Sequence, residues 1–283
     1  MMTDSKEHEL AIQRILVALD ASTHSLAALE AAAKLASSLH AELIGIFVED
    51  ENLLHLAGLP FSHELQSPTA KRTPMDSDVM EHQLHLQAAQ ARWALENAAQ
   101  KAEVSWSFQT IRGQVTPSVL SAALSADLVA LGRVSRPLHA RRRLGSTARA
   151  ASEMERSVLI MQQGSSLTYP VLVTYDGSAA AQQALTAAAK LARLSGDKLD
   201  VLLITDEYEQ AKPLRDEIVT WLEEHDLTAE FRWLPETSVE KLAEMVQSRK
   251  ECILVLGGDN PLLEAGAIQD LLDKTDCPVL LVR

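Results

Sequence analysis

Hydrophobic residues follow two alternating patterns along the chain. Short uninterrupted apolar runs are typical of strands that are buried on both faces of a parallel sheet. Longer segments with helical spacing separate these runs. In the first half the runs are Ile15–Leu19, Leu43–Val48, Leu128–Leu131 and Val158–Met161, and the predicted helices are Ser25–Ser38, Val79–Lys101, Pro117–Ala126 and Thr147–Glu155. This alternation predicts an α/β fold with a doubly wound sheet flanked by helices.

The pattern occurs twice. The string ALEAAAKLA at Ala28–Ala36 recurs as ALTAAAKLA at Ala184–Ala192. At the same offset, Ile15–Ser22 recurs as Val171–Ser178. Because several consecutive elements repeat in one register, we predict two tandem α/β domains, each with a five-stranded, mostly parallel sheet flanked by helices.

A short polar link, residues 162–168, marks the predicted boundary between domains at 1–165 and 166–283. The first copy carries additional residues at about 51–77 that are rich in proline, serine and mixed polarity. This composition predicts a long loop with room for one short helix. The loop is interpreted either as a mobile excursion, or as a lid over a ligand or a contact to the second domain.

Composition limits the possible function classes. A hydrophobic fraction of 47% with 23% charged residues is typical of a soluble globular protein. No apolar run is long enough to span a membrane, and the polar N-terminus lacks a signal-peptide core. We therefore expect a cytoplasmic protein without a membrane partner. The net charge of −13 argues against nucleic-acid binding, because the phosphate backbone repels an acidic surface.

The segment Leu131–Ala151 (LGRVSRPLHARRRLGSTARAA) reverses this acidic balance locally. Gly132 ends a predicted strand, and Gly145-Ser146-Thr147 opens a predicted helix. Glycine permits close backbone approach, and a helix start with hydroxyl groups suits an anion. The sequence thus favours a phosphate cradle, and an ordinary helix N-cap with solvated arginines is the alternative. The arginines are Arg133, Arg136, Arg141, Arg142, Arg143 and Arg149.

Asp20 follows the first strand, and Asp176 follows the corresponding strand of the second copy. A carboxylate at the end of a central strand can accept hydrogen bonds from a ribose or a base. Each aspartate could equally cap the helix that follows it. The recurrence in both copies is compatible with both interpretations.

These residues resemble the universal stress protein family over nearly the whole chain, as a tandem two-domain member. That family's nucleotide-binding pattern is G-x2-G-x9-G-[ST], and here serine replaces the second glycine. The resemblance implies that the first domain binds ATP, with or without Mg²⁺, or a related adenine nucleotide. It places Asp20 and Val48 at the adenosine end, and it places the following residues around the phosphates and ribose: Leu131, Gly132, Ser135, Gly145, Ser146 and Thr147.

The second copy departs from this pattern. After Gly257 the loop is shorter, and Ala267 and Ile268 replace the two hydroxyl residues. Asp259 and Glu264 add negative charge where a phosphate would lie. We therefore expect one working nucleotide site, in the first copy, and one degenerate site.

Catalytic motifs are absent from the sequence. It contains no Gly-x-Ser-x-Gly elbow and no Gly-x4-Gly-Lys-Ser/Thr loop. His82 and His85 share a helix face, with His55 and His63 nearby, but they are interpreted as surface histidines rather than as a metal site. The prediction is a nucleotide-binding stress regulator with an unspecified protein partner. A scaffold that binds no nucleotide is the alternative, and slow ATP hydrolysis is a weaker one.

Two further features bear on assembly and redox chemistry. The last strands of the copies, Ser157–Met161 and Pro278–Val282, are short and apolar. In the resembled family such strands pair across a dimer, which implies an internal pseudo-dimer and leaves open a homodimer of whole chains. Cys252 and Cys277 are interpreted as buried apolar side chains rather than as a redox pair, although neighbouring parallel strands would bring them close.

Overall fold

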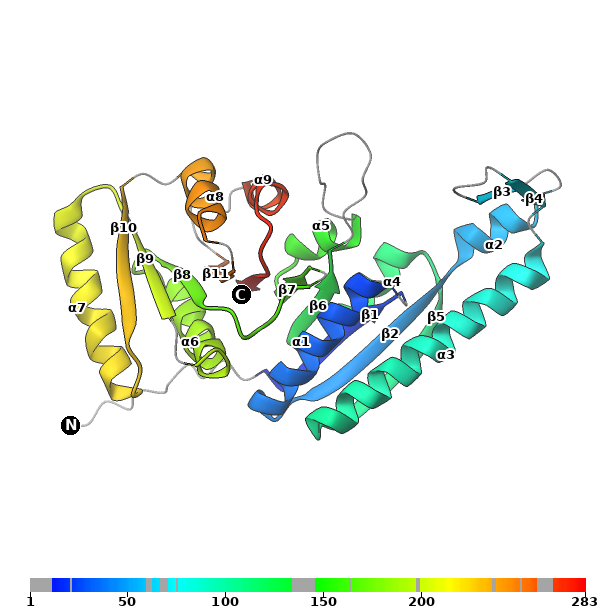
Figure 1. Cartoon of the computed structure of the whole chain (residues 1–283), viewed down its shortest axis with the longest axis horizontal. Coiled ribbons are helices and arrows are strands. Elements are labelled where there is room, and N and C mark those ends of the chain that lie inside the picture. The colour runs from blue at the N-terminus through cyan, green and yellow to red at the C-terminus, as the bar shows by residue number, and fades with distance from the viewer. Residues whose placement is uncertain are drawn as a thin grey trace.

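The computed structural model describes residues 12–20, 22–59, 63–66, 71–74, 76–133, 146–162, 164–196, 199–235, 238–249, 251–258 and 267–283. Within these residues, ten strands form one sheet, and two further strands form a separate hairpin. The two copies lie end to end along the longest axis of the molecule (Figure 1).

The first copy contains the strands β1 (Arg14–Leu19), β2 (Glu42–Asp50), β3 (His63–Gln66), β4 (Lys71–Pro74), β5 (Trp106–Gly113), β6 (Leu128–Gly132) and β7 (Ser157–Met161). Its helices are α1 (Thr23–Leu39), α2 (Glu51–Ala57), α3 (Ser77–Ala102), α4 (Val115–Ala123) and α5 (Ser146–Ser152).

The second copy contains the strands β8 (Val171–Tyr175), β9 (Leu199–Thr205), β10 (Ala229–Pro235), β11 (Ile253–Gly257) and β12 (Val279–Val282). Its helices are α6 (Ala179–Leu194), α7 (Tyr208–Glu224), α8 (Val239–Gln247) and α9 (Ala267–Lys274).

The strand order of the large sheet is β10-β9-β8-β11-β12-β7-β6-β1-β2-β5. Within this sheet, the strand pairs inside each copy are parallel, which agrees with the predicted mostly parallel sheets. At the centre, β7 and β12 pair antiparallel, with Ile160 opposite Val279. The last strands therefore join the two half-sheets edge to edge, and this arrangement fits an internal pseudo-dimer.

The helices cover the sheet in two layers. One layer packs Leu29 of α1 and Leu95 of α3 against the sheet, and α6 and α7 continue it in the second copy. The opposite layer contains α4, α5, α8 and α9, with Val119 of α4 as an example. Because both faces are covered, the central strands β6, β7, β8, β11 and β12 are almost completely buried. This explains their uninterrupted apolar sequences.

The predicted helices are confirmed, with different ends. Helix α4 ends at Ala123 rather than at Ala126, because the next amides bond three residues back, as in Ala126 N to the carbonyl of Ala123. Helix α5 ends at Ser152 rather than at Glu155, and the amides of the two following residues bond in the same way. These tight turns continue the apolar spacing without continuing the α-helix.

The insertion of the first copy contains more regular structure than the sequence predicted. Helix α2 begins at Glu51, and the antiparallel strands β3 and β4 follow. Helix α3, which follows the insertion, has 26 residues, whereas the corresponding helix α7 of the second copy has 17. The hairpin lies beyond α2 at the end of the molecule that is remote from the second copy (Figure 1). The alternative that the insertion contacts the second domain is therefore wrong for its described residues.

Among the described residues, no helix combines the length and the apolar character that crossing a bilayer requires.

Candidate functional site

The candidate site lies at the point where the strand order in the sheet of the first copy reverses. The chain passes from β1 through α1 to β2 on one side, whereas β6 lies on the other side of β1. The register pairs Leu19 with Phe47, so the next residues, Asp20 and Val48, are neighbours at the carboxyl edge. The β1–β6 register, continued from Val17 opposite Ala130, brings Gly132 to the same edge. Such switch points bind ligands in doubly wound folds.

Asp20 is exposed at the end of β1, where it organises a turn. Its Oδ1 accepts a hydrogen bond from the amide of Ser22 at 3.0 Å. Although the side chain is exposed, neighbouring protein atoms displace part of the water around its carboxylate and raise the pKa of Asp20. Hydrogen bonds from Ser22 and Ser25 outweigh this effect and leave the pKa below its ordinary value of 3.8. The carboxylate is therefore ionised at neutral pH.

The alternative that Asp20 caps α1 is wrong, because Ser22 occupies the N-cap position. The Ser22 hydroxyl accepts a hydrogen bond from the amide of Ser25 at 3.2 Å. The second copy repeats this arrangement. The Oδ1 of Asp176 accepts from the amide of Ser178 at 2.9 Å, and Ser178 caps α6. The turn is thus a shared local structure, and its recurrence by itself does not indicate a ligand.

Gly132 lies against the first turn of α1. A Cβ atom at this position would lie 2.5 Å from the carbonyl carbon and oxygen of His24. In the second copy, a Cβ on Gly257 would lie 2.6 Å from the carbonyl oxygen of Ala180. Glycine is therefore required in both copies by the packing of strand against helix. This packing explains the glycine at position 132 without a bound phosphate.

Two of the predicted site residues have side chains in the core. Leu131 is buried, and Val48 is half-buried against the layer that contains α4. Only their backbone groups therefore lie at the carboxyl edge of the sheet. Val48 lies opposite Ile111 in the pairing of β2 with β5.

The remaining loop residues are only partly described. Ser135 and Gly145 lie outside the described residues, and Ser146 begins α5. Thr147 is half-buried, and its Oγ1 lies 3.0 Å from the Oγ1 of Thr116 at the start of α4. In the second copy the corresponding Ile268 is buried in the same helical layer. The Thr147 hydroxyl therefore already has a hydrogen-bond partner on α4.

Two arginines of the cluster contact the second copy. Arg133 is 2% exposed, and its Nη1 donates a hydrogen bond to the carbonyl oxygen of Thr275 in the second copy. Arg149 lies on α5 with Nη2 4.0 Å from Oδ2 of Asp273 on α9. These two arginines therefore contribute to the contact between the copies. The others, Arg136, Arg141, Arg142 and Arg143, lie outside the described residues.

A buried carboxylate, which no sequence motif indicates, lies next to Val48. Glu49 is 6% exposed, and its Oε2 lies 3.0 Å from Nη2 of Arg112. Its Oε1 lies 3.3 Å from Nε2 of His85 on α3, a residue predicted to be a surface histidine. Arg112 also contacts Glu81 on α3. The cluster attaches α3 to the outer strands, and the described residues contain no group of three metal-ligand side chains.

Comparison with protein families decides the chain's affiliation. The model of the universal stress protein family matches residues 11–160 and again residues 169–283. The chain belongs to the universal stress protein family. The two matches correspond to the two copies of the repeat, so this is a tandem member, as the sequence motifs indicate.

Solved structures share the whole tandem fold of this family member. A universal stress protein from Archaeoglobus fulgidus DSM 4304 has a TM-score of 0.68 and 15% identity, covering 95% of this chain and 98% of that chain. A functionally unknown protein from Pseudomonas aeruginosa PAO1 has a TM-score of 0.61 and 14% identity, covering 96% and 93%. At these identities the likeness shows the fold alone. No curated protein matches this chain.

Proposed function

We propose that the first copy binds ATP or a related adenine nucleotide, and that the bound protein acts as a stress-response regulator rather than as a fast enzyme. The observation that carries the proposal is the placement of Asp20, Val48 and Gly132 at one edge of the sheet. The glycine and hydroxyl pattern of the family's nucleotide loop begins at that edge.

Asp20 supplies the acceptor for the nucleoside. Its lowered pKa keeps the carboxylate ionised at neutral pH. An ionised carboxylate offers about four lone-pair positions, so the hydrogen bonds from Ser22 and Ser25 leave capacity for a ribose hydroxyl. The backbone of Val48 lies beside it and is the expected neighbour of the adenine ring.

The phosphates would be held by the backbone after Gly132 and by Ser135, Gly145, Ser146 and Thr147. No group of three metal-ligand side chains occurs among the described residues. A Mg²⁺ ion that accompanies the nucleotide would be bound largely by the phosphates and by water, because this cation keeps several of its water ligands.

The second copy offers a matched control. It keeps Asp176 and its turn, but Ile268 is buried where the first copy has Thr147. The proposal therefore locates a single nucleotide in the first copy. Isothermal titration with ATP should give one site per chain, and Asp20→Ala should weaken it at least tenfold, whereas Asp176→Ala should leave it unchanged.

Two outcomes of this titration would overturn the proposal. One is the absence of both heat and a thermal shift at millimolar ATP. The other is an equal loss of affinity in Asp20→Ala and Asp176→Ala, since the aspartates would then act only through the shared turn. Circular dichroism of both variants establishes that they remain folded.

The second candidate function is a scaffold that works through protein surfaces without a nucleotide. It is favoured by the structural role of Gly132 and by the use of Arg133 between the copies. Gly145→Asp places a carboxylate in the proposed phosphate loop, where it repels a phosphate. If ATP does not bind, and if Gly145→Asp changes neither stability nor partner binding, the scaffold function is favoured over the nucleotide-binding regulator. Slow ATP hydrolysis is checked by release of inorganic phosphate.

A further inference from the structure

The two cysteines of the second copy lie directly opposite one another. Cys252 immediately precedes β11, and Cys277 lies just before β12. The parallel register of these strands begins with Leu254 opposite Val279, and its extension by two residues toward the strand starts places Cys252 opposite Cys277. The ladder continues in this direction, because the amide of Leu254 donates to the carbonyl oxygen of Pro278 at 2.9 Å.

This placement suits a disulfide. Paired residues of neighbouring parallel strands have Cα atoms about 4.8 Å apart, which lies within the range of about 4.4–6.8 Å found across disulfides. Both side chains belong to the core layer of α8 and α9, so they lie on the same face of the sheet. Both cysteines are free thiols in this structure.

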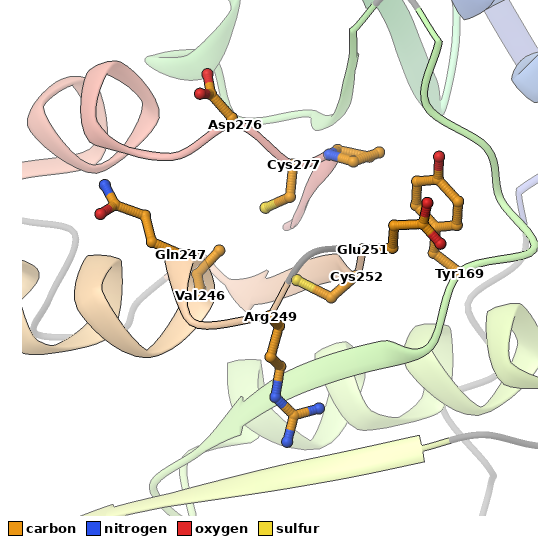
Figure 2. Close-up of a pocket in the computed structure, with 9 residues that line it drawn as sticks. Tyr169, Val246, Gln247, Arg249, Glu251, Cys252, Asp276 and Cys277 are labelled. Atoms are coloured by element: carbon orange, nitrogen blue, oxygen red, sulfur yellow. The ribbon is translucent and has the colours of Figure 1, made fainter.

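A partly open cavity of about 180 Å³ leads to the pair. Figure 2 shows Cys252 and Cys277 on neighbouring segments with both sulfur atoms turned toward this cavity. The cysteines are buried, at 1% and 8% exposure, so a reagent has to reach them through the cavity. The residues that line it include the polar Gln247, Glu251 and Asp276, which suits a small polar molecule.

The environment distinguishes the two thiols. A hydrogen bond from Cys277 and the charge of Arg249 lower the pKa of Cys252, against the opposing effect of burial. The same hydrogen bond, together with burial, raises the pKa of Cys277 well above its ordinary value. Cys252 is therefore the thiol that ionises first, and Cys277 donates its S–H to the resulting thiolate.

We propose that Cys252 and Cys277 form a reversible redox site that a hydroperoxide converts from a dithiol to a disulfide. In the first step the Cys252 thiolate attacks one peroxide oxygen, the O–O bond breaks, and Cys252 becomes a sulfenic acid while water or an alcohol leaves after protonation. In the second step the Cys277 sulfur attacks the Cys252 sulfur, an S–S bond forms, and the sulfenic oxygen leaves as water with the Cys277 proton. A small thiol reverses the change by exchange.

The disulfide would bind β11 covalently to β12 at the end where both strands begin. Strand β12 is also the strand that pairs with β7 of the first copy. Oxidation would therefore link β12, which contacts the first copy, covalently to its neighbour β11. This site is separate from the nucleotide site, and its test uses no nucleotide.

The test treats the native full-length chain with a small excess of hydrogen peroxide and then alkylates free thiols under denaturing conditions. We expect intact-mass spectrometry to show loss of both alkylation sites and one internal disulfide, which dithiothreitol reverses. In Cys277→Ser, a sulfenic-acid probe such as dimedone should label Cys252. In Cys252→Ser, labelling of Cys277 should be at least tenfold slower.

The wild-type measurement alone decides the matter, so the result does not depend on the folding of either variant. Two alkylated thiols after peroxide treatment would refute the redox site. A disulfide between two chains would also refute it, and so would oxidation of Cys252 to sulfinic acid without a disulfide. In both cases Cys277 would not have reacted with the oxidised Cys252 of the same chain.

Discussion

Gly132 at the end of β6 lies in direct contact with the backbone of His24 in α1, so closely that a Cβ atom would lie 2.5 Å from the His24 carbonyl. This contact brings the start of the first helix to the edge where Asp20 and Val48 meet. The corresponding Gly257 makes the same approach to Ala180 in a copy whose loop has lost the hydroxyls. The packing of strand against helix therefore requires glycine in both copies, and the proposed nucleotide loop begins at one of these two glycines.

The variant Gly132→Ala should lower the free energy of unfolding by about 1–3 kcal/mol, because the neighbouring atoms are backbone and cannot rotate away. Gly257→Ala should have a similar effect. Urea denaturation followed by circular dichroism measures both changes. Gly58→Ala is the matched control, since its Cβ would lie 3.4 Å from the nearest atom. Unchanged stability in Gly132→Ala would contradict the packing role.

Asp20 should make the stability of the first copy dependent on pH. Because its native pKa lies below the ordinary 3.8, the ionised form stabilises the fold above that value. This contribution is lost as the pH falls through the lowered native pKa. The difference in unfolding free energy between wild type and Asp20→Asn should therefore be largest near neutral pH and vanish in strong acid. An NMR titration in which the Asp20 carboxyl has its midpoint at or above 3.8 would contradict this expectation.

Arg133 should act as a residue of the contact between the copies. The variant Arg133→Ala removes a buried side chain and leaves the Thr275 carbonyl without that donor, so we expect a loss of about 2–4 kcal/mol in denaturant unfolding. Arg149→Ala is the control, because its longer contact with Asp273 is partly exposed and should contribute less than about 1 kcal/mol. Loss of ATP heat without loss of stability in Arg133→Ala would instead identify Arg133 as a phosphate ligand.

Oxidation of the cysteine pair should stabilise the second copy. A disulfide across a loop of the length between Cys252 and Cys277 contributes about 3–4 kcal/mol by restricting the unfolded chain. The midpoint of thermal unfolding should therefore rise after peroxide treatment and return after reduction, while Cys252→Ser should show no such rise. A lower midpoint in the oxidised wild type would mean that the bond strains the strands.

The strand and helix pattern could be predicted because it depends on short-range properties of the chain. Runs such as Leu128–Leu131 are continuous because helices cover both faces of the sheet, and the repeated strings revealed the duplication. The pairing of β7 with β12 follows from the family resemblance rather than from spacing, and only the structure shows that this pairing is antiparallel. The apolar spacing predicts ends for α4 and α5 that are too late, because a tight turn preserves this spacing without preserving the helix.

The side-chain partners at the site could not be predicted in the same way. Asp20 was a candidate cap, but Ser22 has the geometry of the N-cap. The arginines form a cluster in the sequence, yet Arg133 extends into the second copy. Glu49 belongs to the sequence FVED and carried no signal, although it is buried beside Arg112.

The sequence by itself determined the duplicated α/β architecture, the family and the difference between the two loops, because apolar periodicity and motif spacing are properties of the chain. Only the tertiary structure decided what each polar residue contacts. Gly132 meets His24, Arg133 meets Thr275 and Cys252 meets Cys277 because sheet register and helix packing bring distant segments together. The spacing of residues along the chain carries no information about those distances.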